Sequence, residues 1–123
     1  MDEGFYDNSP KFRLVMRKLR LRLLANTILD IRMQTMNMSD EEAMNLMTSE
    51  CFQTEAEAKG KLRRAKLSST QLPTYYVGLR DWLQLRKDYQ AAAGKNFDLA
   101  EFHNKVLDQG SLPIMYLRQI VMK

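Results

Sequence analysis

Three short helix-start signatures constrain the fold of this chain more than any other feature of its sequence. In each, a serine, threonine or aspartate precedes a glutamate by three residues, as in Ser39–Glu42, Thr54–Glu57 and Asp98–Glu101. In such a capping box the first side chain accepts a hydrogen bond from the third helical N–H, and the glutamate bonds back. We therefore expect helices from about 39 to 48, from about 54 to 67, and from 98 to about 109.

The segment before the first box predicts one long helix. Residues 1–9 read as an irregular lead-in, after which Ser9 offers a cap and Pro10 occupies the first helical position. The helix should run from Pro10 to about Met36. Its apolar residues lie on more than one face, and a helix of this kind is generally buried among other helices.

The remaining segments also have helical periodicity. Ser68-Ser69-Thr70 should end one helix and cap the next, with Pro73 in the first turn of a helix that stops near Gly94. Ser111-Leu112-Pro113 should open a last helix. With no convincing strand, we predict an all-α fold of about six helices, forming a single helical domain over residues 1–123.

Composition excludes several classes of function. The single Cys51 and the single His103 cannot form an internal disulfide, an H-E-x-x-H pair or a zinc site built from Cys and His alone. The net charge of +4 is mild, and the basic residues of the long helix point in several directions, so we expect no nucleic-acid partner. No apolar run approaches the ~20 residues that span a bilayer, so we expect no membrane partner.

Few residues suggest chemistry on pattern alone. His103 is typical of a packing or surface histidine, and Cys51 of a small buried hydrophobe. The methionines between positions 33 and 47 favour core filling over an adaptable binding surface. The most suggestive segment is Tyr75-Tyr76-Val77-Gly78, because Gly78 inside a helix costs ~1 kcal/mol against alanine, and a close approach by a helix or ligand would offset it. By pattern, the tyrosines are more typical of a core than of a pocket.

Four longer signatures resemble the C-terminal region of a bacterial family known as domain of unknown function 885. They are Leu29-Asp30-Ile31-Arg32 before Met38-Ser39-Asp40-Glu41-Glu42-Ala43, Phe52-Gln53 before Glu55-Ala56-Glu57-Ala58, Gln71-Leu72-Pro73-Thr74-Tyr75-Tyr76-Val77-Gly78, and Phe97-Asp98-Leu99 with Phe102-His103 and Gly110-Ser111-Leu112-Pro113. The family is similar in plan to helical zinc metallopeptidases of the gluzincin type. Its metal ligands lie upstream of the region that resembles Met1-Asp2-Glu3-Gly4.

The resemblance implies that this chain is the C-terminal part of a longer protein and forms one wall of its substrate cleft. Tyr75, with Tyr76 as the alternative, corresponds to the tyrosine that such peptidases supply to the transition state. Gln71, Gly78, Asp30 and Gln34 would lie along the cleft, Gln34 standing where members often have histidine. The chain itself would hold no metal or cofactor, whereas the parent protein would hold zinc and act on a peptide substrate.

Two partner expectations follow. The remainder of the parent chain should cover part of the long helix, so the isolated fragment should form homo-oligomers through its apolar faces. The alternative function is a stand-alone helical module that binds a partner protein through the methionine-rich region. Residues 1–10 are acidic and contain no apolar stretch, so we expect no signal peptide there. The compartment of the parent stays open, with the periplasm or export as options.

Overall fold

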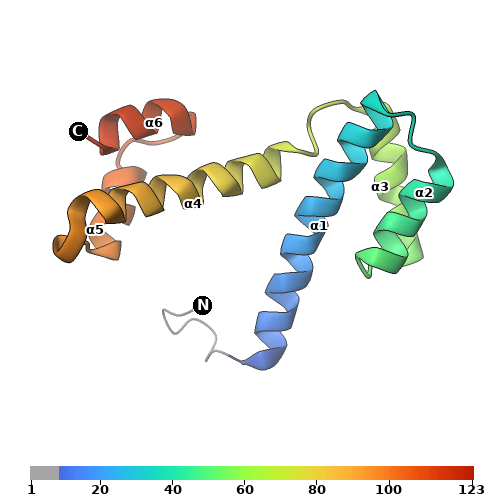
Figure 1. Cartoon of the computed structure of the whole chain (residues 1–123), viewed down its shortest axis with the longest axis horizontal. Coiled ribbons are helices and arrows are strands. Elements are labelled where there is room, and N and C mark those ends of the chain that lie inside the picture. Colours follow the sequence, from blue (N-terminus) through green and yellow to red (C-terminus); the bar gives the residue numbers. More distant parts are fainter. Residues whose placement is uncertain (1–8) are drawn as a thin grey trace. The chain divides into compact units, whose positions relative to one another are not determined.

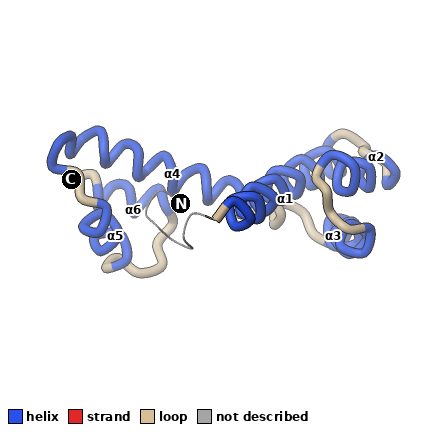
Figure 2. Tube along the Cα trace, turned by 90° about the horizontal axis from the view of Figure 1, so that it is seen from below, coloured by secondary structure: helices blue, strands red, loops and turns tan. Residues whose placement is uncertain are grey.

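The regular structure is entirely helical in the computed structural model, which describes residues 9–123 (Figure 1, Figure 2). The α-helices are α1 (Pro10–Thr35), α2 (Asp40–Asn45), α3 (Glu55–Leu67), α4 (Thr74–Ala93), α5 (Leu99–Leu107) and α6 (Ile114–Val121). A π-helical turn, Leu46–Glu50, follows α2. The all-α prediction of about six helices is confirmed. Most of the predicted lead-in, including Met1-Asp2-Glu3-Gly4, lies outside the described residues.

The predicted capping residues begin three of these helices. The Ser39 hydroxyl accepts from the Glu42 N–H at 3.2 Å, and the Glu42 carboxylate accepts from the Ser39 N–H at 2.8 Å. Thr54 and Glu57 form the same pair of bonds at the start of α3, and the Asp98 carboxylate accepts from the Glu101 N–H at 2.7 Å. The local signals for these helix starts are therefore confirmed.

Other local predictions need correction. Helix α4 begins at Thr74, so Pro73 lies just before it rather than inside its first turn, and Thr70 does not cap it. The physical reason is that a residue preceding proline, here Leu72, is disfavoured in the helical conformation. Ser9 occupies the predicted cap position of α1, but its side chain makes no capping hydrogen bond.

The first compact unit ends at Tyr76 and has its core between α1, α2 and α3. In Figure 1, α2 and α3 lie beside the C-terminal half of α1. The core consists of apolar side chains that are fully buried: Leu29, Ala43, Met47, Ala58, Ala65 and Leu72. Met33, Met38 and Met44 pack against it, so core filling accounts for most of the methionine cluster, while Met36 is exposed.

The second compact unit covers Val77–Lys123 and has a core of its own between α4, α5 and α6. Its buried members are Leu85, Phe102, Val106, Leu117 and Val121. Phe97 and Phe102, which flank the start of α5, both pack their rings against Tyr89. The boundary between the units falls within α4, and the expectation of a single domain over residues 1–123 stays a prediction. Among the helices of residues 9–123, none combines the length and the hydropathy of a membrane span.

Apolar side chains are exposed along the whole of α1 and are not buried among the described helices. The exposed set along α1 comprises Leu14, Val15, Leu19, Leu24, Ile28 and Ile31. Exposed apolar surface that extends over several hundred Å² usually marks an interaction site. We therefore expect the isolated 123-residue chain to self-associate, with an apparent mass in sedimentation that rises with protein concentration. A constant monomer mass at high concentration would contradict this prediction.

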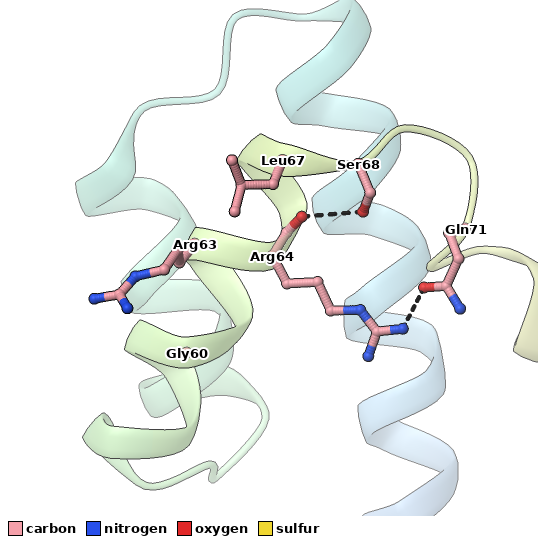
Figure 3. A pocket seen from close by; sticks show the side chains of 6 residues that line it. All are labelled: Gly60, Arg63, Arg64, Leu67, Ser68 and Gln71. Atoms are coloured by element: carbon pink, nitrogen blue, oxygen red, sulfur yellow. Dashed lines mark hydrogen bonds between the residues drawn. The ribbon is translucent and has the colours of Figure 1, made fainter.

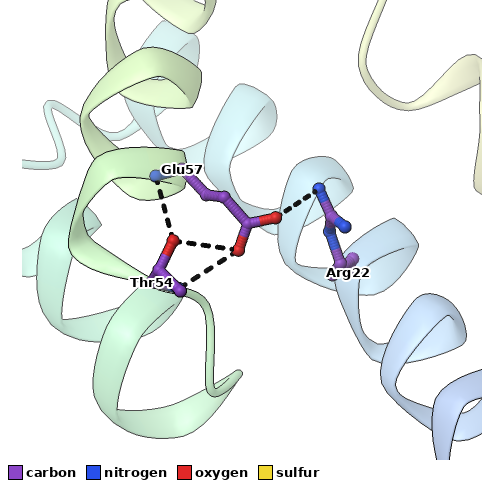
Figure 4. Close-up of polar contacts among 3 residues, drawn as sticks. All are labelled: Arg22, Thr54 and Glu57. Atoms are coloured by element: carbon purple, nitrogen blue, oxygen red, sulfur yellow. Dashed lines mark hydrogen bonds and ion pairs between the residues drawn. The ribbon is translucent and has the colours of Figure 1, made fainter.

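The Glu57 carboxylate links α3 to α1 and makes the stability of this unit depend on pH. It accepts from the Thr54 N–H at 3.2 Å and pairs with the Arg22 guanidinium at 3.2 Å (Figure 4). The backbone bond from Thr54 and then the Arg22 charge lower the pKa of Glu57 from its ordinary value of 4.5. Because the pKa is lower in the folded state, ionised Glu57 stabilises the fold above about pH 4.5, and this contribution is lost as the pH falls through the folded pKa.

Glu57→Gln keeps the shape and hydrogen-bonding capacity of the side chain and removes its charge. We expect this variant to be less stable than the parent chain at pH 7, because the Arg22 pair is lost. The difference should shrink as the pH is lowered toward 3, since the wild-type carboxylate is then protonated as well. Urea denaturation at several pH values measures it, and a difference independent of pH would count against the assignment.

Candidate functional site

Tyr75 lies in the first turn of α4, and its hydroxyl is held by the turn that precedes this helix. The amide nitrogen of Gln71 donates to the Tyr75 hydroxyl oxygen at 3.1 Å. A hydroxyl that accepts this bond keeps its own proton free to donate to another group. The Tyr75 side chain is 49% exposed, so its phenol is accessible in this chain. The core role that the pattern favoured for Tyr75 is therefore wrong.

The orientation of Gln71 is set by a cation on the neighbouring helix. The Arg64 guanidinium donates to the Gln71 side-chain oxygen at 2.6 Å, reaching across from α3 as drawn in Figure 3. With its oxygen bound to Arg64, the amide must present its nitrogen to Tyr75. Three side chains from α3, the turn and α4 therefore form one hydrogen-bonded series.

This series also changes the acidity of the phenol. The hydrogen bond from Gln71 lowers the pKa of Tyr75 below its usual value, with further lowering by the hydrogen bond and charge of Arg64 and by the charge of Lys61. A phenol of lower pKa is a stronger hydrogen-bond donor, because its oxygen bears developing negative charge more readily. The arrangement suits a donor to an anionic oxygen.

Asp30 and Gln34 hold the α3–α4 connection in place from one face of α1. The buried Asp30 carboxylate accepts from the Thr70 N–H at 2.9 Å, and Thr70 has a φ of +67° that is uncommon for a non-glycine residue. The Gln34 amide donates to the Ala65 carbonyl at 3.0 Å. These two predicted residues thus fix the segment from which Gln71 reaches Tyr75, and both act through backbone groups. Their expected place along a substrate cleft stays a prediction.

Tyr76 and Gly78 are not brought into this hydrogen-bonded series. Tyr76 is half-buried and follows Tyr75 by about 100° of helix rotation. At Gly78, an added Cβ would meet no atom of the described residues within 4 Å. The close approach that the sequence predicted at Gly78 is therefore not made by another helix of the second unit, within the described residues. A ligand or another part of the parent protein stays a prediction there.

A hollow opens beside Arg64, at the C-terminal end of α3. Its volume is about 480 Å³, and its lining comes from α3 and the following turn: Gly60, Arg63, Arg64, Leu67, Ser68 and Gln71 (Figure 3). Lys61 and Arg64 are not among the site residues predicted from the sequence. The missed signal was their spacing of three residues, which places them on one side of α3, where Arg64 meets the Gln71–Tyr75 pair.

The other sequence candidates do not gather at this site. His103 is exposed on α5 with its ring beside Phe102, as expected of a packing or surface residue. Cys51 is buried, and desolvation raises the pKa of its thiol, which agrees with the role of a small hydrophobe. Within residues 9–123, no group of three His, Cys, Asp or Glu side chains is placed to hold a metal ion.

Comparison with known proteins agrees with the resemblance in the sequence. The family model described as "Bacterial protein of unknown function (DUF885)" matches residues 1–121. The chain belongs to the DUF885 family. No curated protein matches the chain significantly. A solved structure from Shewanella oneidensis, of a proposed lipoprotein of unknown function, is 43% identical to this DUF885 chain with a TM-score of 0.94.

The structural match extends over only part of the Shewanella chain. The match covers 99% of this chain and 22% of the Shewanella chain, so the chain spans about a fifth of that relative. This chain therefore resembles one part of that longer chain.

Proposed function

We propose that this chain is the C-terminal, cleft-forming part of a zinc metallopeptidase-like DUF885 protein and is inactive by itself. The observation that carries the proposal is the Tyr75 hydroxyl, which accepts from Gln71 at 3.1 Å and retains a proton to donate on an exposed surface. The resemblance of Gln71–Gly78 to the tyrosine-bearing helix of such peptidases supports the same role. The partners are the remainder of the parent chain and a peptide substrate.

In this proposal Tyr75 stabilises the transition state of peptide hydrolysis. When water attacks the scissile carbonyl, the carbonyl oxygen gains negative charge, and the Tyr75 O–H donates a hydrogen bond to it. Gln71 keeps the phenol oriented, while Arg64 fixes Gln71 and favours negative charge nearby. Asp30 and Gln34 position the turn that bears Gln71 and do not touch the reacting atoms.

The residues of this chain do not fit a zinc site, because no three candidate ligands come together within residues 9–123. The ligands would be supplied by the remainder of the parent protein, where zinc would polarise the scissile carbonyl and activate water. No step assigned to the present residues passes through the metal.

Two measurements test whether the zinc ligands come from the remainder of the parent protein: the metal content of this chain and the coding sequence upstream of Met1. We expect the chelator-washed 123-residue chain to bind no stoichiometric zinc and to hydrolyse no peptide, because it has one His and one Cys and no ligand group comes together within residues 9–123. We expect the reading frame upstream of Met1 to encode H-E-x-x-H, and the intact parent to lose peptide hydrolysis on chelation. One tightly bound zinc per isolated chain in elemental analysis would contradict the assignment, as would a parent without the motif.

The alternative function, a stand-alone module that binds a partner through its methionines, has less support. Met47 is fully buried, and Met33, Met38 and Met44 pack against the first core. Only Met36 of this cluster is largely exposed, at 66%. Side chains committed to a core are not available as an adaptable binding surface.

A further inference from the structure

One face of α3 carries an excess of positive charge where it approaches Tyr75. Glu57, Lys61 and Arg64 are spaced at i, i+4 and i+7, so they lie on one side of the helix. Arg22 of α1 reaches the same side through its 3.2 Å ion pair with Glu57. Within residues 9–123, Arg22, Lys61 and Arg64 thus carry three positive charges on the side of α3 where Glu57 carries one negative charge.

That carboxylate is already engaged. Glu57 pairs with Arg22 and accepts from the backbone and hydroxyl of Thr54, each at 3.2 Å. Within residues 9–123, Lys61 makes no hydrogen bond or ion pair, and the Arg64 guanidinium donates to the uncharged Gln71 amide. Lys61 and Arg64 are thus two neighbouring cations that form no ion pair within residues 9–123, and the Glu57 charge that acts on Lys61 is shared with Arg22.

Lys61 lies in an environment that disfavours its own positive charge. The side chain is half-buried, and desolvation, followed by repulsion from Arg64 and Arg22, lowers its pKa from the ordinary value. Repulsion between like charges in a partly desolvated site is relieved when an anion binds between them. A guanidinium fork beside an ammonium group suits a planar carboxylate, with the fork supplying paired donors and the ammonium a point charge.

We propose that Lys61 and Arg64 form a subsite that binds a carboxylate next to the Tyr75 hydroxyl. That the carboxylate belongs to a peptide substrate rests on the proposed function. Either a C-terminal α-carboxylate or an acidic side chain supplies the required chemistry. In a peptidase, this subsite would select substrates with a carboxylate close to the scissile bond, because Tyr75 is the proposed donor to the reacting oxygen.

Binding of three matched peptides tests the subsite without requiring turnover. The probes are N-acetyl-alanyl-alanine with a free carboxylate, its C-terminal amide, and N-acetyl-alanyl-glutamate with its C-terminus amidated. We expect at least one carboxylate peptide to bind the full chain tenfold or more tightly than the neutral amide, measured by calorimetric or NMR titration. Which carboxylate is preferred identifies its source. Equal affinity for all three peptides would overturn the proposal.

Charge-matched variants separate a site from a general electrostatic effect. Lys61→Gln and Arg64→Gln should each remove most of the tenfold preference. Lys66→Gln removes the same charge two residues from Arg64, from a side chain that pairs with Asp40 of α2 and does not line the hollow, and should retain the preference. Equal losses in the Lys66 and Arg64 variants would overturn the proposal. Because binding is measured directly, the subsite can fail while Tyr75 still supports catalysis, and the reverse also holds.

Discussion

Replacing Tyr75 by phenylalanine in the intact parent protein is expected to lower kcat on the order of a hundredfold or more, with little change in KM. The lost hydroxyl would donate to an oxyanion that exists in the transition state and not in the substrate carbonyl, so its removal affects the chemical step selectively. Loss of one such donor typically costs ~3 kcal/mol. The ring remains, and because Tyr75 is 49% exposed in this chain, we expect the fold to survive.

Tyr76→Phe is the matched control for this measurement. It removes the same hydroxyl from the adjacent residue, which points elsewhere by about 100° of helix rotation and takes no part in the Arg64–Gln71–Tyr75 series. We expect near-normal turnover of a verified peptide substrate. If both variants had equal, mild effects on kcat, Tyr75 would not be a catalytic residue.

Replacing Leu72 by alanine is expected to destabilise the first unit by about 2–5 kcal/mol. Leu72 is fully buried in the core formed with Leu29 and Met47, and it lies between Gln71 and Pro73 in the turn that leads into α4. Truncation removes apolar contacts and leaves a cavity that surrounding helices fill only in part. Thermal or urea denaturation followed by far-ultraviolet circular dichroism measures the loss.

Leu67→Ala provides the matched control, because Leu67 is the same residue type at the end of α3 and is 81% exposed. Exposed substitutions of this kind usually change stability by less than about 0.5 kcal/mol. The comparison therefore isolates burial as the cause. Similar losses in the two variants would mean that Leu72 does not anchor the turn.

Local chemistry made most helix boundaries predictable. A capping box involves only four consecutive residues, so Ser39 and Thr54 could be identified as helix starts from sequence alone. Gly94 ends α4 with a φ of +56°, a conformation that glycine adopts without a steric penalty. The π-helical turn at Leu46–Glu50 was not predicted, because its two buried residues, Leu46 and Met47, are placed by packing against other helices.

For the candidate site, the sequence by itself determined the pair that shares a local segment. Gln71 and Tyr75 are four residues apart, and the resemblance identified both, together with Asp30 and Gln34. Only the tertiary structure decided what Asp30 and Gln34 do, since Asp30 bonds to a backbone N–H 40 residues away and Gln34 to a carbonyl 31 residues away.

The charge around Tyr75 also depends on tertiary structure. In the sequence, Lys61 and Arg64 are ordinary cations near a helix end, and Glu57 is an ordinary capping residue. Folding places Arg22 beside Glu57, and the two side chains form an ion pair. Lys61 and Arg64 then form no ion pair within the described residues, and Arg64 donates to the Gln71 amide that holds Tyr75. Hydrogen bonds between neighbours in sequence can be predicted from spacing, whereas the balance of charge at a surface is decided by how helices distant in sequence pack together.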